Sequence, residues 1–291
     1  MDDNASAAPS EPGALIIADS GGVSKAGVRN NGRTGMLIIN ADDWGRDCNT
    51  TDRMLDCVLH RSVSSVSAMV FMSDTERSAL LAREHAVDAG LHLNLTLPFS
   101  DPACPSKLIE RQRKLVGFLT RHPLARVVFH PGLMNSFEYV VKFQLDEFSR
   151  LYGRPPERID GHHHVHLCAN VLFGSLLPKG TTVRRNFSFL PGEKGLTNRL
   201  YRKAIDSKLA RRHVMVDFLF PLAPLEPRAR LERVRSLAEQ HVVEVETHPI
   251  NADEYKFLTG EEVVRWTKGM PIAARFYTAG NDRNIMQGAR T

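Results

Sequence analysis

Cysteine is scarce in this chain of 291 residues, and its four copies lie far apart in the sequence. They are Cys48, Cys57, Cys104 and Cys168, which form no CxxC pair and do not have the spacing of a disulfide framework. This pattern indicates a reducing environment, so we expect a cytoplasmic protein.

Long apolar runs are also absent. No run approaches the about 18 residues that a membrane-spanning helix needs, so we expect no membrane span. The apolar stretch at residues 14–18 is too short for the core of a secretion signal, and no basic residue precedes it. These absences favour a soluble protein.

Positive charge is present but not concentrated. The net charge is +5, and the basic residues form short clusters such as Arg111–Lys114 and Arg211–Arg212, without a continuous stripe. A nucleic-acid-binding protein would need a concentrated patch with a recognised motif, so we expect no nucleic-acid partner. We interpret most of these charges as parts of solvated faces.

The chain does contain enough apolar residues for one large domain. Hydrophobic residues make up 42% of the sequence, which suffices for a substantial α/β core. Residues 1–34 are rich in Ala, Ser, Gly, Pro and Asn, and we predict that they form a flexible leader. Residues 35–291 are predicted to form a single domain, and no internal repeat of fixed period divides it.

Strand-like and helix-like segments alternate along this domain. The first strand, residues 36–40, is a continuous apolar run, as expected for a strand covered on both faces. Further strands are predicted at residues 64–70, 90–96, 158–166, 181–185, 214–220, 242–247 and 273–278. Helices are predicted at residues 49–60, 73–85, 108–120, 136–151, 169–177, 198–212, 227–240 and 259–268. The alternation implies a mainly parallel sheet, either open or closed into a barrel.

Four histidines lie within five positions of the segment Asp160–His166. If the segment is a strand, His162, His164 and His166 share one side and His163 faces the other. Imidazole is the commonest protein ligand for a transition metal, and several imidazoles on one face rarely lie together without a cation or a shared proton. We therefore predict a metal site here, with a polar loop as the alternative.

Other strands also end in chemically capable residues. Asp42 and Asp43 follow the first strand, His92 lies in the third, and His248 follows the strand at 242–247. Barrel-like α/β enzymes build their sites from the ends of several parallel strands, so we expect these side chains to converge. One carboxylate and two histidines can hold Zn, Fe, Co, Mn or Ni, and a second carboxylate beside them can deprotonate a bound water. Both aspartates reach the site only if the backbone turns after the strand, for which Gly45 is suited.

Each of these residues also has a structural alternative. Asp42 could cap the helix that follows its strand. His92, taken alone, could be a buried core histidine. His248 could simply end its strand before a proline.

Four segments, in this order along the chain, resemble the signature motifs of the YdjC-like carbohydrate deacetylases. They are Asn40–Gly45 (NADDWG), Gly90–Thr96 (GLHLNLT), Asp160–His166 (DGHHHVH) and Glu246–Pro249 (ETHP). The resemblance runs from residue 36 to residue 280, and Trp44 departs from the Phe that is usual in the family. It implies an α/β fold, a distorted βα-barrel of mainly parallel strands, and removal of acetyl groups from N-acetylated sugars with a divalent cation.

The resemblance also implies roles for individual residues. Asp43, His92 and His162 match the metal ligands, and we expect Mg²⁺ or Zn²⁺ as the cation. Asp42 matches the general base. His248 matches a site histidine, which we assign as the general acid.

Further residues are assigned from their positions beside these motifs. His164 and His166 either act in the site or fix the orientation of the ligand rings from behind. Asn94 is expected to contact the site or the substrate. Arg184 and Arg185 are expected to bind sugar hydroxyls or an anionic group, with plain surface charge as the alternative.

We therefore expect a hydrolase of linear amides that releases acetate from an amino sugar, either chitooligosaccharide-like or part of a lipid-linked glycan. A metal-dependent phosphoesterase is the alternative enzyme, because His-rich strand ends also serve that chemistry. A sugar- or metal-binding protein without activity is a third hypothesis, which the adjacent aspartate pair disfavours. A homodimer is compatible with the sequence.

Overall fold

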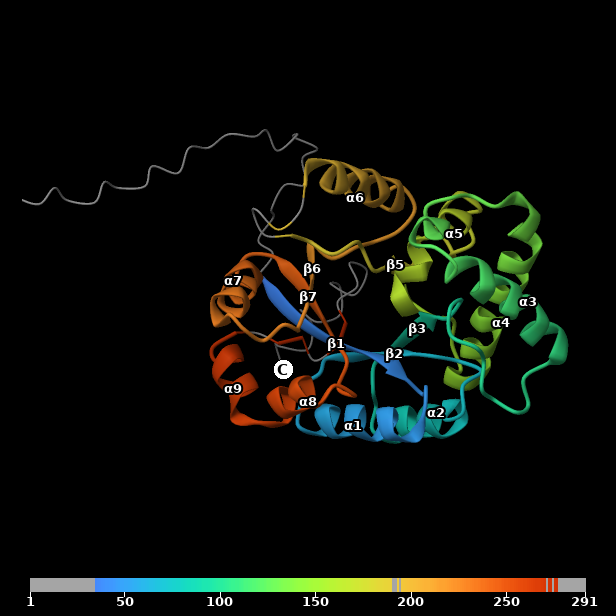
Figure 1. The fold of residues 1–291 in the computed structure, drawn as a ribbon. Coiled ribbons are helices and arrows are strands. Elements are labelled where there is room, and N and C mark those ends of the chain that lie inside the picture. Colours follow the sequence, from blue (N-terminus) through green and yellow to red (C-terminus); the bar gives the residue numbers. More distant parts are fainter. Residues whose placement is uncertain (1–34, 190–192, 194, 271, 274, 277–291) are drawn as a thin grey trace, which may run out of the picture. The chain divides into compact units, whose positions relative to one another are not determined.

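The computed structural model describes residues 35–276 apart from 190–192, 194, 271 and 274. The leader predicted at residues 1–34 lies outside the described residues, as does part of the strand predicted at 273–278. In the described part of the chain, seven strands form one parallel sheet in the order β5-β4-β3-β2-β1-β7-β6 (Figure 1). The strands are β1 (Met36–Trp44), β2 (Ser65–Ala68), β3 (Ala89–Leu93), β4 (Arg158–Gly161), β5 (Thr182–Val183), β6 (Phe218–Pro221) and β7 (Val242–Thr247).

One stretch of chain joins the two edges of this sheet. Val214 forms a bridge with Thr182 of β5, and the chain then continues into β6, which pairs with β7. The backbone N–H of Val183 donates to the carbonyl oxygen of Val214 over 2.9 Å. Residues 214–221 therefore close the sheet into a distorted barrel, and the predicted fold class is confirmed.

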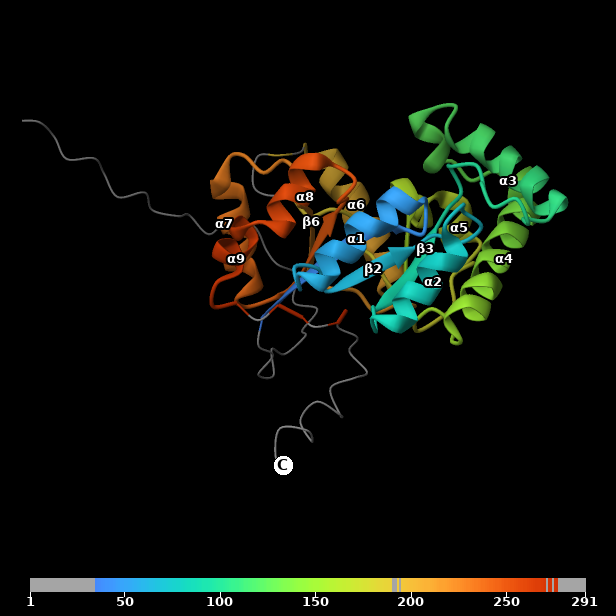
Figure 2. The same cartoon turned by 90° about the horizontal axis from the view of Figure 1, so that it is seen from below.

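Helices cover the outside of the strands (Figures 1 and 2). They are α1 (Cys48–Leu59), α2 (Thr75–Glu84), α3 (Ser106–Leu119), α4 (Met134–Tyr152), α5 (Ala169–Phe173), α6 (Leu196–Leu209), α7 (Arg228–Ala238), α8 (Ala252–Thr259) and α9 (Glu261–Thr267). Short 3-10 helices are η1 (Pro123–Arg126), η2 (Pro131–Leu133) and η3 (His162–Leu167). None of the helices that the structure describes is both long and apolar enough to cross a membrane.

The helices differ from the sequence prediction at two places. α5 ends at Phe173, where the prediction continued to residue 177. α8 is not predicted at all, because its eight residues are too few to show a clear apolar period.

The core lies between the central strands and the surrounding helices. Leu37, Ile38 and Ile39 of β1 have no exposed surface, because β2 and β7 flank this strand and both of its faces are covered. Leu37 and Ile39 belong to the main core, whereas Ile38 packs with Val216 and Val242 in a smaller cluster. On α4, Phe137 and Phe148 are fully buried as well. This rigid packing fixes where the carboxyl ends of the strands lie, and with them the side chains that follow each strand.

Candidate metal centre and active site

The carboxyl ends of β1, β3 and β4 bring three predicted ligands together: Asp43, His92 and His162. Nδ1 of His162 lies 2.9 Å from Oδ1 of Asp43, and Nε2 of His92 lies 3.3 Å from the same oxygen. One ligand atom from each of the three residues lies within 4.8 Å of the others. This is the spacing of side chains that can share one cation.

Asp43 reaches the cluster because β1 bulges at this residue. Its φ angle is 77°, and the register with β2 shifts between Asp42 and Trp44. In a regular strand, Asp42 and Asp43 would point to opposite faces. The left-handed residue, which is uncommon outside Gly, lets both carboxylates line the same cavity. Gly45, with a φ of 85°, completes the predicted turn.

The histidine run does not continue its strand. β4 ends at Gly161, and the next six residues form η3. Within η3, His163 and His164 have φ angles of 54° and 56°, which lie in the left-handed region. The predicted strand with alternating faces is therefore wrong, because two consecutive left-handed residues bend the chain sharply. His162 is the member of the run that joins the ligand cluster.

His92 is held in the orientation that a metal ligand needs. Its Nδ1 lies 2.8 Å from Oδ1 of Asp160, and its Nε2 is buried with no hydrogen-bond partner among the described residues. A proton on Nδ1, donated to Asp160, leaves a lone pair on Nε2 facing Asp43. The buried, unpartnered nitrogen fits a cation bound in this cluster.

The electrostatics of the cluster also favour a cation. Burial raises the pKa of Asp43, but hydrogen bonds and charge interactions with His162 and His92 outweigh burial and hold the pKa well below its ordinary value. For Asp160, burial is again outweighed, chiefly by Arg184 and then by His92, so its pKa is also well below the ordinary range. Both carboxylates are therefore ionised at neutral pH.

Arg184 lies behind the cluster, buried among four carboxylates. Its guanidinium donates to both oxygens of Asp42 over 2.6 and 2.8 Å and lies 2.9 Å from Asp160. It also lies 2.7 Å from Glu244 and 3.2 Å from Glu246. Arg184 is only 2% exposed, so it offers the substrate no free donor. The structure thus shows Arg184 as a residue that orients Asp42.

Asp42 does not cap the helix that follows it. The side chain of Asp47 caps α1 by accepting a hydrogen bond from the backbone N–H of Thr50. Asp42 is instead held by Arg184, with Oδ2 3.9 Å from Nδ1 of His92. This position beside the cluster is compatible with the predicted role of Asp42 as the general base.

Two other predicted substrate contacts lie away from the cavity. Asn94 is fully buried, and its side chain donates to the carbonyl of Leu97 and accepts from the N–H of the same residue. Arg185 is ion-paired with Asp206 over 2.9 Å. Neither Asn94 nor Arg185 lines the cavity at the ligand cluster, and their contact with substrate stays a prediction.

Residues 36–268 match the family model of YdjC-like proteins. The chain belongs to the YdjC-like family. This match confirms the resemblance inferred from the four motifs.

Two curated relatives of this YdjC-like protein carry named activities. A carbohydrate deacetylase from Danio rerio is 31% identical over 167 residues, which are 55% of this chain and 51% of that protein. A chitooligosaccharide deacetylase from Yersinia pestis (strain Pestoides F) is 31% identical over 137 residues, 47% of this chain and 52% of that protein. The chain spans about half the length of the curated relatives it matches.

A solved structure shares the fold. It comes from Enterococcus faecalis V583 and is provisionally assigned to cellobiose-phosphate cleavage. The TM-score is 0.56 at 21% identity, over 83% of this chain and 97% of that chain. This similarity concerns the arrangement of strands and helices.

The remaining predicted histidines of the YdjC-like site differ in position. His166 is fully buried, and its Nε2 lies 2.9 Å from the carbonyl oxygen of Arg184. Burial lowers the pKa of His166 to about 4, so the neutral ring donates from Nε2 and supports the segment that holds Arg184. Burial also lowers the pKa of His164 well below its ordinary value. His164 lines the cavity, with Nε2 3.4 Å from Oε2 of Glu246.

His248 belongs to a second cluster on the same cavity. Asp42, Glu246 and His248 offer ligand atoms within 4.8 Å of one another, and His248 is one-third exposed. The Nε2 of His248 lies 3.9 Å from Oε1 of Glu246. Burial, followed by repulsion from Asp42, raises the pKa of Glu246 to about 8. The sequence analysis assigns no role to Glu246, although its place in the ETHP motif is a signal that could have found it.

We expect replacement of Glu246 by Gln to stabilise the protein, and more so at higher pH. The pKa of Glu246 is raised from 4.5 to about 8, so folding opposes its ionisation, and the native residue loses stability as pH rises through this window. Relative to the native protein, E246Q should raise the free energy of unfolding by up to about 4 kcal/mol near pH 8 and by less than about 1 kcal/mol near pH 5. Urea unfolding at both pH values measures this difference. If E246Q and the native protein differed in free energy of unfolding by the same amount at both pH values, the raised pKa of Glu246 would be contradicted.

The ligand cluster and the second cluster line one cavity of about 380 Å³. Its walls also carry Arg46, Ile250 and Asn251, which the sequence analysis does not name, and His163, which it places on the side opposite to His162. Nη1 of Arg46 lies 2.7 Å from Oδ2 of Asp43, the carboxylate oxygen that faces away from the imidazoles. Arg46 thus fixes the second oxygen of a predicted ligand.

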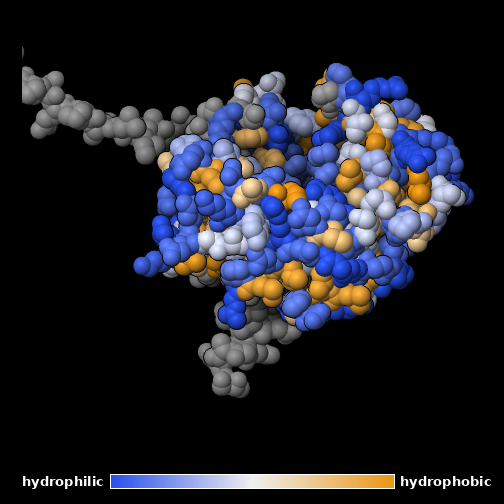
Figure 3. Space-filling view, turned by 60° about the horizontal axis from the view of Figure 1, so that its bottom comes forward, coloured by the Kyte–Doolittle hydropathy of each residue, from blue (hydrophilic) through white to orange (hydrophobic). Residues whose placement is uncertain are grey.

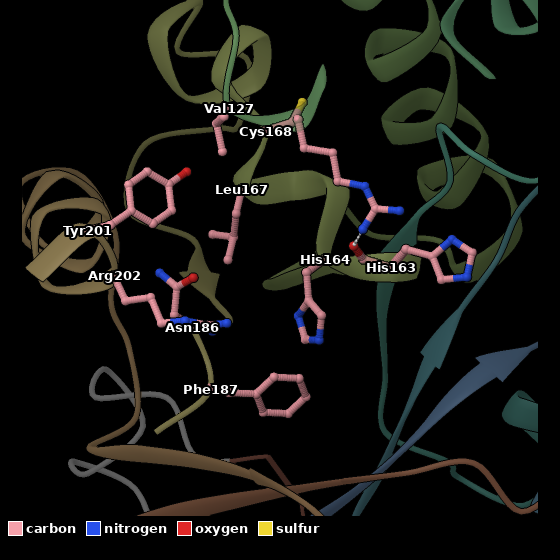
Figure 4. Close-up of a pocket in the computed structure, with 10 residues that line it drawn as sticks. Val127, His163, His164, Leu167, Cys168, Asn186, Phe187, Tyr201 and Arg202 are labelled. Atoms are coloured by element: carbon pink, nitrogen blue, oxygen red, sulfur yellow. Dashed lines mark hydrogen bonds between the residues drawn. The ribbon is translucent and has the colours of Figure 1, made fainter. Parts of the chain in front are cut away.

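A second cavity, of about 290 Å³, adjoins the first through shared walls. His163 and His164 line both cavities, and Phe187, Tyr201 and Arg202 lie around the second one (Figure 4). Aromatic and cationic side chains of this kind suit a ligand with both apolar and polar faces.

Proposed function

We propose that this YdjC-like protein is a metal-dependent carbohydrate deacetylase, which hydrolyses the amide of an N-acetylated amino sugar and releases acetate. The observation that carries this proposal is the ligand cluster with Asp42 held beside it by Arg184. The family match and the activities named for the two relatives support it. We propose a chitooligosaccharide-like sugar as substrate, with a lipid-linked glycan as the alternative.

Asp43, His92 and His162 would hold a divalent cation, which we propose to be Zn²⁺ or Mg²⁺. Such a cation supplies Lewis acidity, which acidifies a water and polarises the acetyl carbonyl. Asp43 contributes the negative charge. His92 contributes Nε2, in the tautomer that its contact with Asp160 sets.

Asp42 would take the proton from the attacking water. The two hydrogen bonds from Arg184 fix the direction of its carboxylate, so little reorganisation is needed when the water reacts. The oxygen of that water bonds to the acetyl carbon, and the bond from this carbon to the sugar nitrogen breaks. His248 would protonate the departing amine, since it lies in the same cluster as Asp42 and is partly exposed to the cavity.

The test is acetate release from N-acetylated chitooligosaccharides. We expect a chelator to abolish release and added Zn²⁺ or Mg²⁺ to restore it. Asp42→Asn should lower kcat by about 10² to 10⁴-fold while the protein keeps its metal, because the variant loses a base and no ligand. Metal content and initial rates measure these two effects separately.

Two outcomes would overturn the proposal. Acetate release that survives complete chelation would contradict the metal dependence. Phosphate release from a sugar phosphate without any acetate release would favour the phosphoesterase alternative. Loss of metal in Asp42→Asn would instead assign Asp42 as a ligand.

We further propose how the protein is organised in the cell. Residues 35–291 would form the deacetylase domain, and residues 1–34 a leader in front of it. A cytoplasmic location rests on the spacing of the cysteines in the sequence. A homodimer stays an alternative to a monomer.

A further inference from the structure

Large apolar side chains are exposed in three segments of the molecule. Among the described residues, eight of them in these segments are 42–71% exposed. The segments are residues 124–129, the end of α5, and the first half of α6. The eight residues are Leu124, Val127, Val128, Phe129, Phe173, Leu196, Leu200 and Tyr201.

Contacts between side chains join these segments into one surface, which we call the apolar face. The ring of Phe129 packs edge-on against Phe173, with the centroids 6.5 Å apart. Nζ of Lys208 on α6 lies 4.5 Å from the centroid of the same Phe173 ring. Val127 and Tyr201 line the cavity shown in Figure 4 from the first and third segments. Residues 124–129 and α5 are therefore in direct contact, and α6 adjoins them through Lys208 and through the cavity that Tyr201 lines.

α6 is packed unusually loosely for its length. It has 14 residues, and Leu209 is the one that is buried. Leu196 and Leu200 lie one turn apart, on the same side of the helix, and are 71% and 57% exposed. Within the described part of the chain, this apolar strip of α6 therefore has no covering partner.

The charged residues in the chain ranges that carry the apolar face are almost all cations. Residues 120–135, 171–180 and 196–213 contain nine Lys and Arg and one carboxylate, Asp206. The cations are Arg121, Arg126, Lys179, Arg199, Arg202, Lys203, Lys208, Arg211 and Arg212. Asp206 is ion-paired with Arg185. Exposed aliphatic and aromatic side chains set among cations are typical of surfaces that bind anionic lipid bilayers.

The same charges disfavour other partners. In a symmetric dimer the face would meet itself, which would bring nine cations against nine cations. A nucleic acid would match the cations. However, the exposed Leu and Val side chains would find no partner on its phosphate backbone.

We propose that the apolar face docks on the surface of an anionic lipid bilayer. Leu196, Leu200 and Phe129 would enter the boundary between headgroups and acyl chains, and the cations would contact lipid phosphates. This proposal goes beyond the deacetylase function and does not depend on it. The cavity in Figure 4 lies between the docking segments and shares His163 and His164 with the ligand-cluster cavity. Docking would therefore present the site to molecules at the membrane surface.

The test is cosedimentation of the full-length protein with lipid vesicles. Vesicles of phosphatidylcholine are compared with vesicles that also contain about 30% phosphatidylglycerol. We expect at least about 10-fold tighter binding to the anionic vesicles, and loss of most of this binding near 0.5 M NaCl. The double variant Phe129→Asp/Leu200→Asp should lower binding by about 10-fold or more.

A matched control replaces apolar residues on another side of the molecule. Leu59 on α1 and Leu80 on α2 are each 57% exposed. Figure 3 views the side that carries α1 and α2, where apolar residues also reach the surface beside polar ones. The variant Leu59→Asp/Leu80→Asp should bind vesicles as the native protein does. A charge variant, Arg199→Gln/Lys203→Gln, should weaken binding without adding any carboxylate.

Several results would overturn the proposal. One is equal binding to neutral and anionic vesicles, and another is no vesicle binding at all. A third is an equal loss of vesicle binding in Phe129→Asp/Leu200→Asp and in the control Leu59→Asp/Leu80→Asp. If light scattering shows a dimer and Phe129→Asp/Leu200→Asp makes it monomeric, the apolar face binds a second copy of the chain. If the protein binds RNA but no vesicles, the apolar face binds a nucleic acid. Acetate release from soluble sugars is measured on the same variants. A failure of docking is thus distinguished from a failure of the deacetylase function.

Discussion

Replacing Asp43 with Asn is expected to remove both the bound metal and the activity. Oδ1 of Asp43 lies within 3.3 Å of a nitrogen of His92 and of His162, so this oxygen is the centre of the ligand cluster. An amide keeps the size of the side chain but removes the negative charge that attracts the cation. We expect metal affinity and acetate release each to fall by at least about 10³-fold. Metal content after dialysis and initial rates at saturating metal measure the two quantities.

Asp52→Asn is the matched control for this substitution. Asp52 is 61% exposed and pairs with Arg77, away from the cluster. Asp52→Asn removes the same charge as Asp43→Asn but at a position away from the cluster. Metal content and activity should therefore both stay within about 2-fold of the native protein. If Asp43→Asn kept one equivalent of metal and the native rate, the assignment of the ligand cluster would be wrong.

Replacing Arg184 with Met is expected to destabilise the whole protein as well as the site. The variant would leave Asp42, Asp160, Glu244 and Glu246 buried without the cation that they share. Removing one partner of a buried ion pair costs about 3–5 kcal/mol, and we expect a loss of this size in the free energy of unfolding. Acetate release should fall as well, since Asp42 loses its orienting contacts. Chemical unfolding measures the first effect and initial rates the second.

The neighbouring arginine provides the control for this prediction. Arg185 is 25% exposed and pairs with Asp206, so Arg185→Met should cost less than about 1 kcal/mol. The loss in free energy of unfolding caused by Arg184→Met should also become smaller as pH falls from 7 to 5. Burial acts to raise the pKa of Asp160, Glu244 and Glu246, and Arg184 acts to lower it, so without the cation these carboxyls should bind protons in the folded state and stabilise it at low pH. If Arg184→Met and Arg185→Met lost the same free energy of unfolding, the burial of Arg184 among carboxylates would not contribute to stability.

Much of the fold follows from local patterns in the sequence. The apolar run of β1 and the alternation of strands and helices are local properties, and they predict a parallel sheet. Asp43, His92 and His162 could be proposed as ligands because each lies at a strand end within a motif that resembles a known family. α8 escaped prediction because a helix of eight residues has little periodicity of its own.

The rest of the site depends on contacts that no local pattern contains. Arg184 lies 142 residues from Asp42 in the sequence, and the number of carboxylates around it is set by the closed barrel. For this reason the sequence does not reveal that Arg184 is paired with four buried carboxylates. The histidine run suggests a strand, but the left-handed backbone of His163 and His164 turns it into η3. The residue types do not specify left-handed angles at two consecutive histidines, because such angles are uncommon outside Gly.

The bulge at Asp43 makes β1 sensitive to its length. The two adjacent carboxylates face one cavity because a single residue departs from the regular pleat at a fixed distance from the middle of the strand. Loss or gain of one residue upstream would shift every later side chain to the opposite face and separate the two acids. Changes of side chain in β1 should therefore be tolerated more readily during evolution than insertions or deletions.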